Sequence, residues 1–144
     1  MFEIKQPSKI ILGKHSALKI DFPNNCLLIT SKGAYKRGWI EYINLKNYSI
    51  FDQVENNPSI ETAEKIISEF SRHNISSIIG IGGGSVLDVA KYCGYKMNKN
   101  KILIPTTFGS GSEVTRISVL KINNKKQSFH DDRLLADTAI IDSS

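Results

Sequence analysis

The sequence predicts an α/β fold, in which a Rossmann-like, mostly parallel sheet carries helices on both faces and a late β-hairpin. Two observations carry this prediction. Short apolar runs alternate with helical patterns along the chain, which is typical of βαβ units and therefore of a parallel sheet covered on both sides. The one departure from this alternation, near residue 120, has the pattern of two strands joined by a short turn.

Five segments are expected to form buried strands. Each is short and largely apolar, contains no proline and is bounded by turn residues. These segments are residues 26–30, 48–51, 77–81, 101–104 and 139–142.

A helix is expected between the second and third of these strands. Its apolar face is formed at the spacings i, i+3, i+4 and i+7 by Ala63, Ile66, Ile67 and Phe70. Ser59 precedes this pattern as an N-cap.

A second helix is expected after the glycine-rich stretch that follows the third strand. Its apolar face comprises Val86, Ala90, Cys93 and Met97. A weaker helical segment is expected within residues 33–43. The hairpin is expected to consist of residues 114–122, the turn NNKK and residues 127–129.

Composition is that of a single globular domain over residues 1–144, with 40% hydrophobic and 23% charged residues. No apolar run approaches the ~20 residues that span a bilayer, and the N-terminus lacks the order of a signal peptide. We therefore expect a cytoplasmic protein with no membrane partner. Cys26 and Cys93 are too few for a disulfide framework and are expected to be small buried hydrophobes.

The net charge of +5 suits an anionic ligand. The lysines are scattered along the chain, however, and no basic stripe is interleaved with aromatic residues. Nucleic acid is therefore not an expected partner.

The glycine-rich stretch IGIGGGSVLDVAK, residues 79–91, joins a predicted strand to a predicted helix. Glycines let the backbone approach a ligand closely, and the unpaired N–H groups at a helix N-terminus favour an anion. The spacing of Gly80, Gly82 and Ser85 lacks the third glycine of the dinucleotide fingerprint, and no Walker-type loop is present. The pattern alone leaves both a phosphate site and a plain strand-to-helix turn open.

A second polar loop, IPTTFGSGSEVT at residues 104–115, follows the next predicted strand. Its hydroxyl groups suit sugar hydroxyls and phosphate oxygens. In isolation, this segment is equally compatible with a polar surface loop. Two such loops after neighbouring strands favour one shared nucleotide site.

Together, GIGGGSVLDVAK and IPTTFGSGSEVT closely resemble the iron-containing alcohol dehydrogenase family, which is related to glycerol dehydrogenase and dehydroquinate synthase. The stretches IILG, LLIT, NNPSIETAEK and LLADTAIID match in the same order, so that the resemblance covers essentially the whole chain. It implies a dinucleotide-binding domain of an oxidoreductase, which transfers hydride between a nicotinamide cofactor and a small alcohol or aldehyde. The family's C-terminal helical, metal-binding domain is expected to be absent from this chain.

The resemblance also implies which residues contact the cofactor. Its diphosphate is expected at Gly83, Gly84 and Ser85, and Asp88 matches the acid of the GGGSxxD pattern, near the cofactor or substrate cleft. The second loop is expected to line the cofactor through Thr106, Thr107 and Ser110. Further dinucleotide contacts are implied at Asn57, Val119 and Lys126.

One departure from the family pattern concerns the choice of cofactor. Members that prefer NAD often carry an aspartate just after the LLIT-like strand, where it would pair with the adenosine ribose. Here the matching residue is Ser31, followed by Lys32. Without the carboxylate there is no repulsion toward a 2′-phosphate, and the lysine would attract one. NADP is therefore favoured over NAD.

No catalytic or metal-binding residue is expected within this chain. The family's metal ligands, an aspartate and three histidines, lie beyond the segment that AIID matches, so Fe²⁺ or Zn²⁺ is expected only with the C-terminal domain. His15, His73 and His130 show no ligand spacing and are expected to be solvated. The chain alone is expected to be inactive.

Alternative functions remain at this point. The chain could be a stand-alone nucleotide-binding or assembly module that pairs with another chain, including a second copy of itself. A dehydroquinate-synthase-like cyclase or lyase is disfavoured, because the second loop matches the alcohol dehydrogenase version. The compact spacing between the loops resembles phosphonoacetaldehyde reductases, which hints at a small anionic aldehyde as the substrate.

Overall fold

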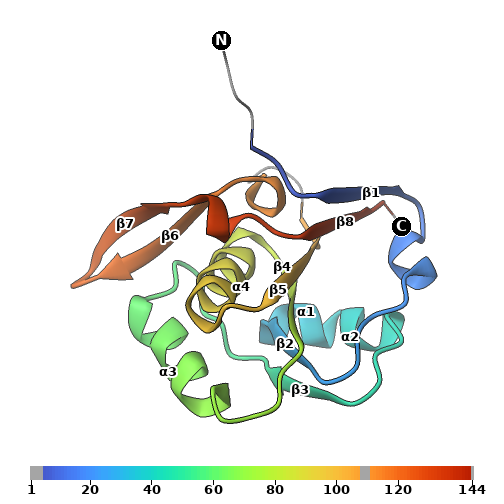
Figure 1. Ribbon diagram of the computed structural model, residues 1–144, viewed down its shortest axis with the longest axis horizontal. Coiled ribbons are helices and arrows are strands. Elements are labelled where there is room, and N and C mark those ends of the chain that lie inside the picture. Colours follow the sequence, from blue (N-terminus) through green and yellow to red (C-terminus); the bar gives the residue numbers. More distant parts are fainter. Residues whose placement is uncertain (1–4, 108–110, 144) are drawn as a thin grey trace.

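The computed structural model describes residues 5–107 and 111–143, and it confirms the predicted α/β class. Within these residues the main sheet has six strands in the order β1-β8-β5-β4-β2-β3, and all neighbouring strands pair in parallel (Figure 1). The strands are β1 Lys9–Gly13, β2 Cys26–Thr30, β3 Tyr48–Phe51, β4 Ser77–Gly82, β5 Asn100–Pro105 and β8 Thr138–Asp142.

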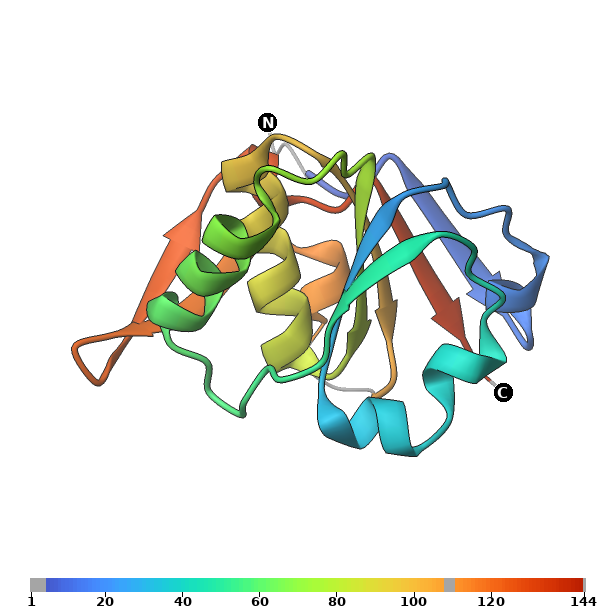
Figure 2. The ribbon, with the colours of Figure 1, turned by 90° about the horizontal axis from the view of Figure 1, so that it is seen from below.

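Helices cover both faces of this sheet (Figure 2). One face packs against α3 Ile60–Phe70 and α4 Gly84–Met97, and the other against α1 Lys32–Lys36, α2 Trp39–Tyr42 and the 3₁₀ turn η1 Ser16–Lys19. Successive side chains of a strand point to opposite faces, so both cores draw on the same strands. In β2, Leu27 and Ile29 enter the core under α3 and α4, whereas Cys26 and Leu28 enter the other.

The predicted hairpin forms a separate two-stranded antiparallel sheet, β6 Ile117–Ile122 and β7 Lys125–His130, which lies outside α4 (Figure 1). Its apolar side packs on the helix, with Phe129 edge-on to Tyr92 at a ring-centroid distance of 5.2 Å. The predicted boundaries were wrong on both sides. Residues 112–114 form the 3₁₀ turn η2 Ser112–Val114, and the turn of the hairpin is only Asn123 and Asn124.

Both turn asparagines have positive φ angles, 51° and 66°, as the tight two-residue hairpin turn requires. The two lysines that were assigned to the turn therefore belong to β7, and Lys126 is paired with Lys121 across the hairpin. A third 3₁₀ turn, η3 Asp132–Leu134, leads from β7 to β8.

Two further differences have local causes. Strand β1 was not predicted because it is an edge strand whose side chains are mostly exposed. The weak helical segment expected within residues 33–43 is two short helices, since Gly38 adopts φ 84° between them. The other predicted strands and helices occur, and the ends that were predicted for them agree to within one residue.

Cys26 and Cys93 are buried free thiols, as predicted. Burial raises the pKa of the Cys93 thiol well above its ordinary value. In the part of the chain that the structure describes, no helix has both the length and the apolar character needed to cross a bilayer.

Candidate functional site

The site lies at the point in the sheet where the chain changes the side on which it adds strands. Strand β2 is followed by β3 on one side, while β4 pairs with β2 on the other. The Thr30 Oγ1 atom donates a hydrogen bond of 2.7 Å to the Ile81 carbonyl, which holds the carboxyl ends of β2 and β4 together. In open parallel sheets, such a switch point is where a crevice for ligands forms.

The glycine loop turns directly from β4 into α4. Gly82 is the last residue of the strand, and Gly83 is the N-cap of the helix, with no side-chain cap. Because the first N–H groups of an α-helix have no partner within the helix, this end of α4 presents donors and the positive end of the helix dipole. Among the described residues, the one atom within 4 Å of a Cβ placed on Gly83 would be Thr107 Oγ1, at 3.3 Å, a tight contact that would require a small shift of the Thr107 hydroxyl.

A cleft of about 760 Å³ opens in front of this loop. The predicted residues that line it are Ser31, Gly83, Gly84, Ser85 and Thr107. Ser31 also caps α1, because its Oγ accepts a hydrogen bond of 3.2 Å from the Ala34 amide. The structure thus brings the ends of β2 and β4, and Thr107 after β5, to one cavity.

A second, smaller cleft of about 200 Å³ adjoins the first. Five predicted residues line it: Asn57, Ser85, Asp88, Val119 and Lys126. Ser85 lines both clefts, and its Oγ accepts a hydrogen bond of 3.2 Å from the Asn57 amide. The two clefts together form an elongated site that runs from α1 to the hairpin.

Thr106 lines neither cleft, and its hydroxyl has no partner among the described residues. Its amide donates to the Gly82 carbonyl at 2.9 Å, which ties the second loop to the glycine loop. Its Oγ1 is buried, and within the described residues it forms no hydrogen bond. A buried polar atom without a partner costs free energy, so this oxygen is a candidate ligand contact. Ser110 lies outside the described residues.

Several residues of the larger cleft were not among the predicted site residues: Gly33, Arg37, Gln53, Val54, Glu55 and Asn56. Lys32 and Arg37 place two cations beside Ser31. Glu55 is hydrogen-bonded to α3, since both of its carboxylate oxygens lie 2.8 Å from Thr62 Oγ1. The position of residues 53–56 in the sequence could have indicated them as site residues, because they follow the carboxyl end of a predicted strand, where ligands bind in this fold class.

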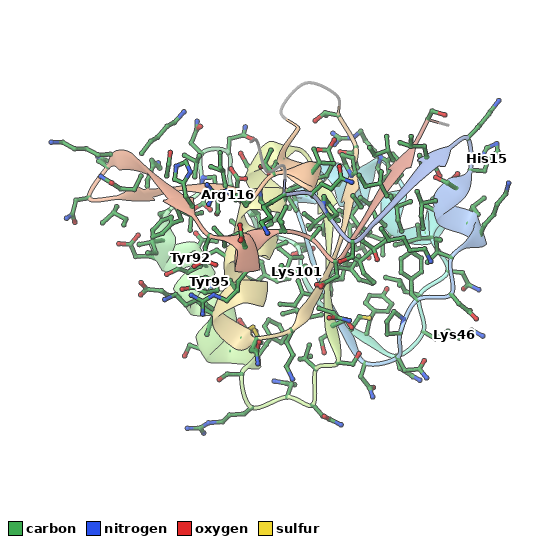
Figure 3. The ribbon with its side chains drawn as sticks, turned by 45° about the horizontal axis from the view of Figure 1, so that its top comes forward. His15, Lys46, Tyr92, Tyr95, Lys101 and Arg116 are labelled. Carbon is green, nitrogen blue, oxygen red and sulfur yellow. The ribbon has the colours of Figure 1, made fainter. Side chains whose placement is uncertain are left out.

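Within the described ranges, no three His, Cys, Asp or Glu side chains lie together as a metal site would require. His15, His73 and His130 are all exposed and lie in different parts of the fold. His15 follows β1 (Figure 3), where its Nδ1 is 2.9 Å from the Tyr42 hydroxyl. The described residues thus supply groups that bind an anion and sugar hydroxyls: helix amides, hydroxyls and cations.

The sequence model of iron-containing alcohol dehydrogenases matches residues 7–143. The chain belongs to this family. A long-chain-alcohol dehydrogenase of Geobacillus thermodenitrificans is 35% identical over 143 residues, which covers 81% of this chain and 36% of that protein. A glycerol-1-phosphate dehydrogenase [NAD(P)+] of Staphylothermus marinus is 31% identical, covering 85% of this chain and 38% of that protein.

The fold is that of the same family. A crystal structure of sulfoacetaldehyde reductase from Bifidobacterium kashiwanohense in complex with NAD+ superposes with a TM-score of 0.88 at 23% identity. That comparison covers 99% of this chain and 46% of the reductase. This iron-containing alcohol dehydrogenase family member therefore spans between about a third and a half of the length of the relatives that it matches.

Proposed function

We propose that residues 1–144 are the dinucleotide-binding domain of an iron-type alcohol dehydrogenase and that the site described above holds NAD(P). The observation that carries this proposal is that two clefts, lined by nine of the eleven predicted cofactor residues, meet at Ser85. Membership of the family supports the same function.

The residues present fit such a cofactor. The absence of a Cβ at Gly83 and the uncapped N-terminus of α4 favour a diphosphate in the larger cleft. The unpartnered Thr106 hydroxyl provides a hydrogen-bonding group at the base of the second loop. Asn57, Asp88, Val119 and Lys126 extend the site along the smaller cleft. When bound, the nicotinamide would supply hydride transfer, and this chain's residues would bind and orient it.

We further propose that the cofactor is NADP rather than NAD. Ser31 stands at the end of β2, where a carboxylate would repel a 2′-phosphate, and Lys32 and Arg37 line the same cleft. The guanidinium of Arg37 lies over Gly33, since a Cβ on Gly33 would be 3.1 Å from Arg37 Nη1. Two cations so placed match a phosphate that carries about two negative charges.

The activity of the whole enzyme belongs to the same proposal. The substrate would be a small alcohol or aldehyde, bound between this domain and a C-terminal helical domain that supplies Fe²⁺ or Zn²⁺. The described residues contain no set of metal ligands, so no step through a metal is assigned to them. A cytoplasmic location agrees with two buried, unpaired cysteines.

A second copy of the chain is a proposed partner. Strand β1 is an outer strand of the main sheet, and Leu12 on it is 69% exposed. Leu18 in the adjoining turn η1 is 52% exposed. An outer strand with apolar side chains favours pairing with another chain. Light scattering after size-exclusion chromatography should show a dimer that Leu12→Lys converts to a monomer; a monomer at all concentrations would oppose this.

Isothermal titration calorimetry of the chain with NADPH and with NADH tests the cofactor proposal. We expect saturable binding of both, with the lower Kd for NADPH, and thermal stabilisation that grows with ligand concentration, by about 2.7 kcal/mol at 100 times the Kd. Absence of binding to either at millimolar concentration would overturn the proposal. The alternative of a non-catalytic module makes the same binding prediction but excludes NADPH-dependent aldehyde reduction by the complete protein.

A further inference from the structure

Lys91 is a charged residue inside the protein. It lies on the inner side of α4, two turns after the glycine loop, and its relative exposure is 0%. Lysine is rarely buried completely unless its ammonium group is paired, because removing a charge from water is costly. The contacts of Lys91 Nζ therefore show what the buried charge supports.

Nearly all of these contacts are with residues 112–117, which lead into the hairpin and include its first residue. Lys91 Nζ donates to the Ser112 carbonyl at 2.8 Å, to Thr115 Oγ1 at 3.2 Å and to the Ile117 carbonyl, and the Thr115 carbonyl lies at 3.5 Å. Within residues 111–117, Ser112–Val114 form a 3₁₀ turn, and the backbone then continues without regular structure to the start of β6. Buried carbonyl groups need partners, and a single ammonium group with three donors serves several of them here.

The same ammonium group acts on a residue of the smaller cleft. Lys91 Nζ lies 3.5 Å from Asp88 Oδ1, one turn earlier on α4. Asp88 Oδ1 also accepts a hydrogen bond of 2.6 Å from Ser112 Oγ, and the Asp88 carbonyl accepts one of 2.7 Å from Ser118 Oγ. Asp88, Ser112 and Lys91 thus form a closed set of contacts that joins α4 to the start of the hairpin.

From these contacts, and resting on the proposed cofactor site, we propose that Lys91 is a positioning residue for that site. Its buried ammonium group fixes the backbone of residues 112–117 and the carboxylate of Asp88, and so sets the shape of the smaller cleft between α4 and the hairpin. Lys91 itself does not line either cleft. Its effect on the cofactor is exerted through Asp88 and through the loop.

Charge is central to this role. Burial lowers the pKa of Lys91, while Asp88 and then Glu113, the charged groups that act on it, oppose this shift. As the pH rises through the lowered pKa, Nζ loses one of its three donors and its charge. The loop and Asp88 then lose part of their support, so cofactor affinity is expected to fall at alkaline pH.

The test compares Lys91→Met, which keeps most of the stem but removes the ammonium group, with a matched control. Lys101→Met also replaces a buried lysine, one that is 6% exposed and 3.7 Å from Asp137 Oδ2. Lys101 lies beside Tyr95 at the opposite end of α4 from the glycine loop (Figure 3). Both variants are expected to lose stability. A loss of cofactor affinity in Lys91→Met but not in Lys101→Met would therefore be due to the location of the Lys91 ammonium group and not to a general loss of stability.

Two readouts are needed. Calorimetry from pH 7 to 10 should show a loss of NADPH affinity of about tenfold or more in Lys91→Met, the order by which supporting residues contribute at other sites. The fall in affinity with pH should disappear in Lys91→Met and persist in Lys101→Met. Hydrogen exchange of the unliganded proteins should be accelerated at residues 112–118 in Lys91→Met only.

Equal affinity and an equal pH profile in Lys91→Met and the unsubstituted chain would overturn the proposal. So would unchanged exchange at residues 112–118. If the unsubstituted chain binds neither dinucleotide, the proposed function fails, and the exchange experiment alone decides whether Lys91 positions the loop.

Discussion

Gly80 of β4 and Ala90 of α4 are so close that a Cβ on Gly80 would lie 2.7 Å from the Cβ of Ala90. The same atom would lie 3.0 Å from Leu103 Cδ2 on β5, and both neighbours are completely buried. Real Cβ contacts are not this short, so the helix packs directly on the backbone of the strand. Gly80 therefore sets the distance of α4 from the sheet.

Gly80→Ala is expected to destabilise the protein by about 1–3 kcal/mol, the usual cost of overpacking a core. The added methyl group must displace α4 or the side chain of Leu103. Urea denaturation followed by circular dichroism measures the change. A variant as stable as the unsubstituted protein would show that α4 can move away from the sheet at no cost.

Gly83→Ala, in contrast, is expected to change stability little and to weaken cofactor binding strongly. Gly83 has an ordinary extended conformation, φ −79° and ψ −174°, and among the described residues its added Cβ would meet the Thr107 hydroxyl alone, at 3.3 Å. Stability should therefore change by less than about 0.5 kcal/mol. The methyl group would stand in the larger cleft, and calorimetry should show at least a tenfold loss of NADPH affinity. Undiminished affinity would place the diphosphate elsewhere.

Thr106→Val is expected to weaken cofactor binding without lowering the stability of the unliganded protein. The buried Thr106 hydroxyl has no partner among the described residues, so its removal should leave the unliganded protein equally stable or slightly more stable. If the hydroxyl bonds the cofactor, affinity should fall by about fivefold, corresponding to a hydrogen bond of about 1 kcal/mol. A loss of stability without a loss of affinity would instead indicate a structural water at this position.

Arg37→Ala is expected to weaken NADPH binding by about tenfold or more and to leave NADH binding nearly unchanged. The reason is that a hydrogen bond between charged groups contributes about 1.5–3 kcal/mol, and only NADPH carries the 2′-phosphate. Lys36→Ala is the control, since Lys36 is exposed on the same helix but does not line the cleft. Equal losses for both cofactors would argue against NADP selectivity.

The Asp131 carboxylate gives a prediction for acid pH. Its hydrogen bonds with the Arg133 side chain, and then with the Arg133 amide, lower its pKa from 3.8 to about 2. Because the folded pKa is depressed, this stabilisation is present above pH 3.8 and is lost as the pH falls through about 2. In Arg133→Ala the remaining amide bond should return the pKa only part of the way to 3.8, measured by ¹³C NMR of the Asp131 carboxyl carbon.

Strands buried on both faces could be predicted because every residue in them is apolar or small. In β2 and β4 no side chain faces water. All five predicted segments form strands, but β3 was wrongly expected to be buried, since it lies at the edge of the sheet and only Phe51 is buried. Strand β1 also contains a short apolar run, residues 10–12, but it lies at the edge of the sheet with only Ile11 partly covered, and it was not predicted as a strand. Its place beside β8 depends on contacts with residues more than 120 positions away.

The candidate site shows the same division. The glycine loop could be located from the sequence, because a close approach of the backbone to a ligand requires glycine and three consecutive glycines are present. The family resemblance added Asn57, Val119 and Lys126 to the predicted site residues. Arg37 could not be found, since it enters the cleft only because α1 stops after one turn and its side chain folds over Gly33. The role of Lys91 was equally invisible, because a lysine on an amphipathic helix normally points to solvent.

The position of β8 between β5 and β1 has a consequence for synthesis on the ribosome. Residues 9–13 leave the exit tunnel long before their partner strand, residues 138–142, is made. Until then both β1 and the open side of β5 are uncovered strand edges, which favour aggregation. The part of the sheet formed by β3, β2, β4 and β5, four of its six strands, is complete by residue 105 and can form first. Closure of the sheet thus waits for residues 138–142, and β1 is the strand that stays unpaired longest during synthesis.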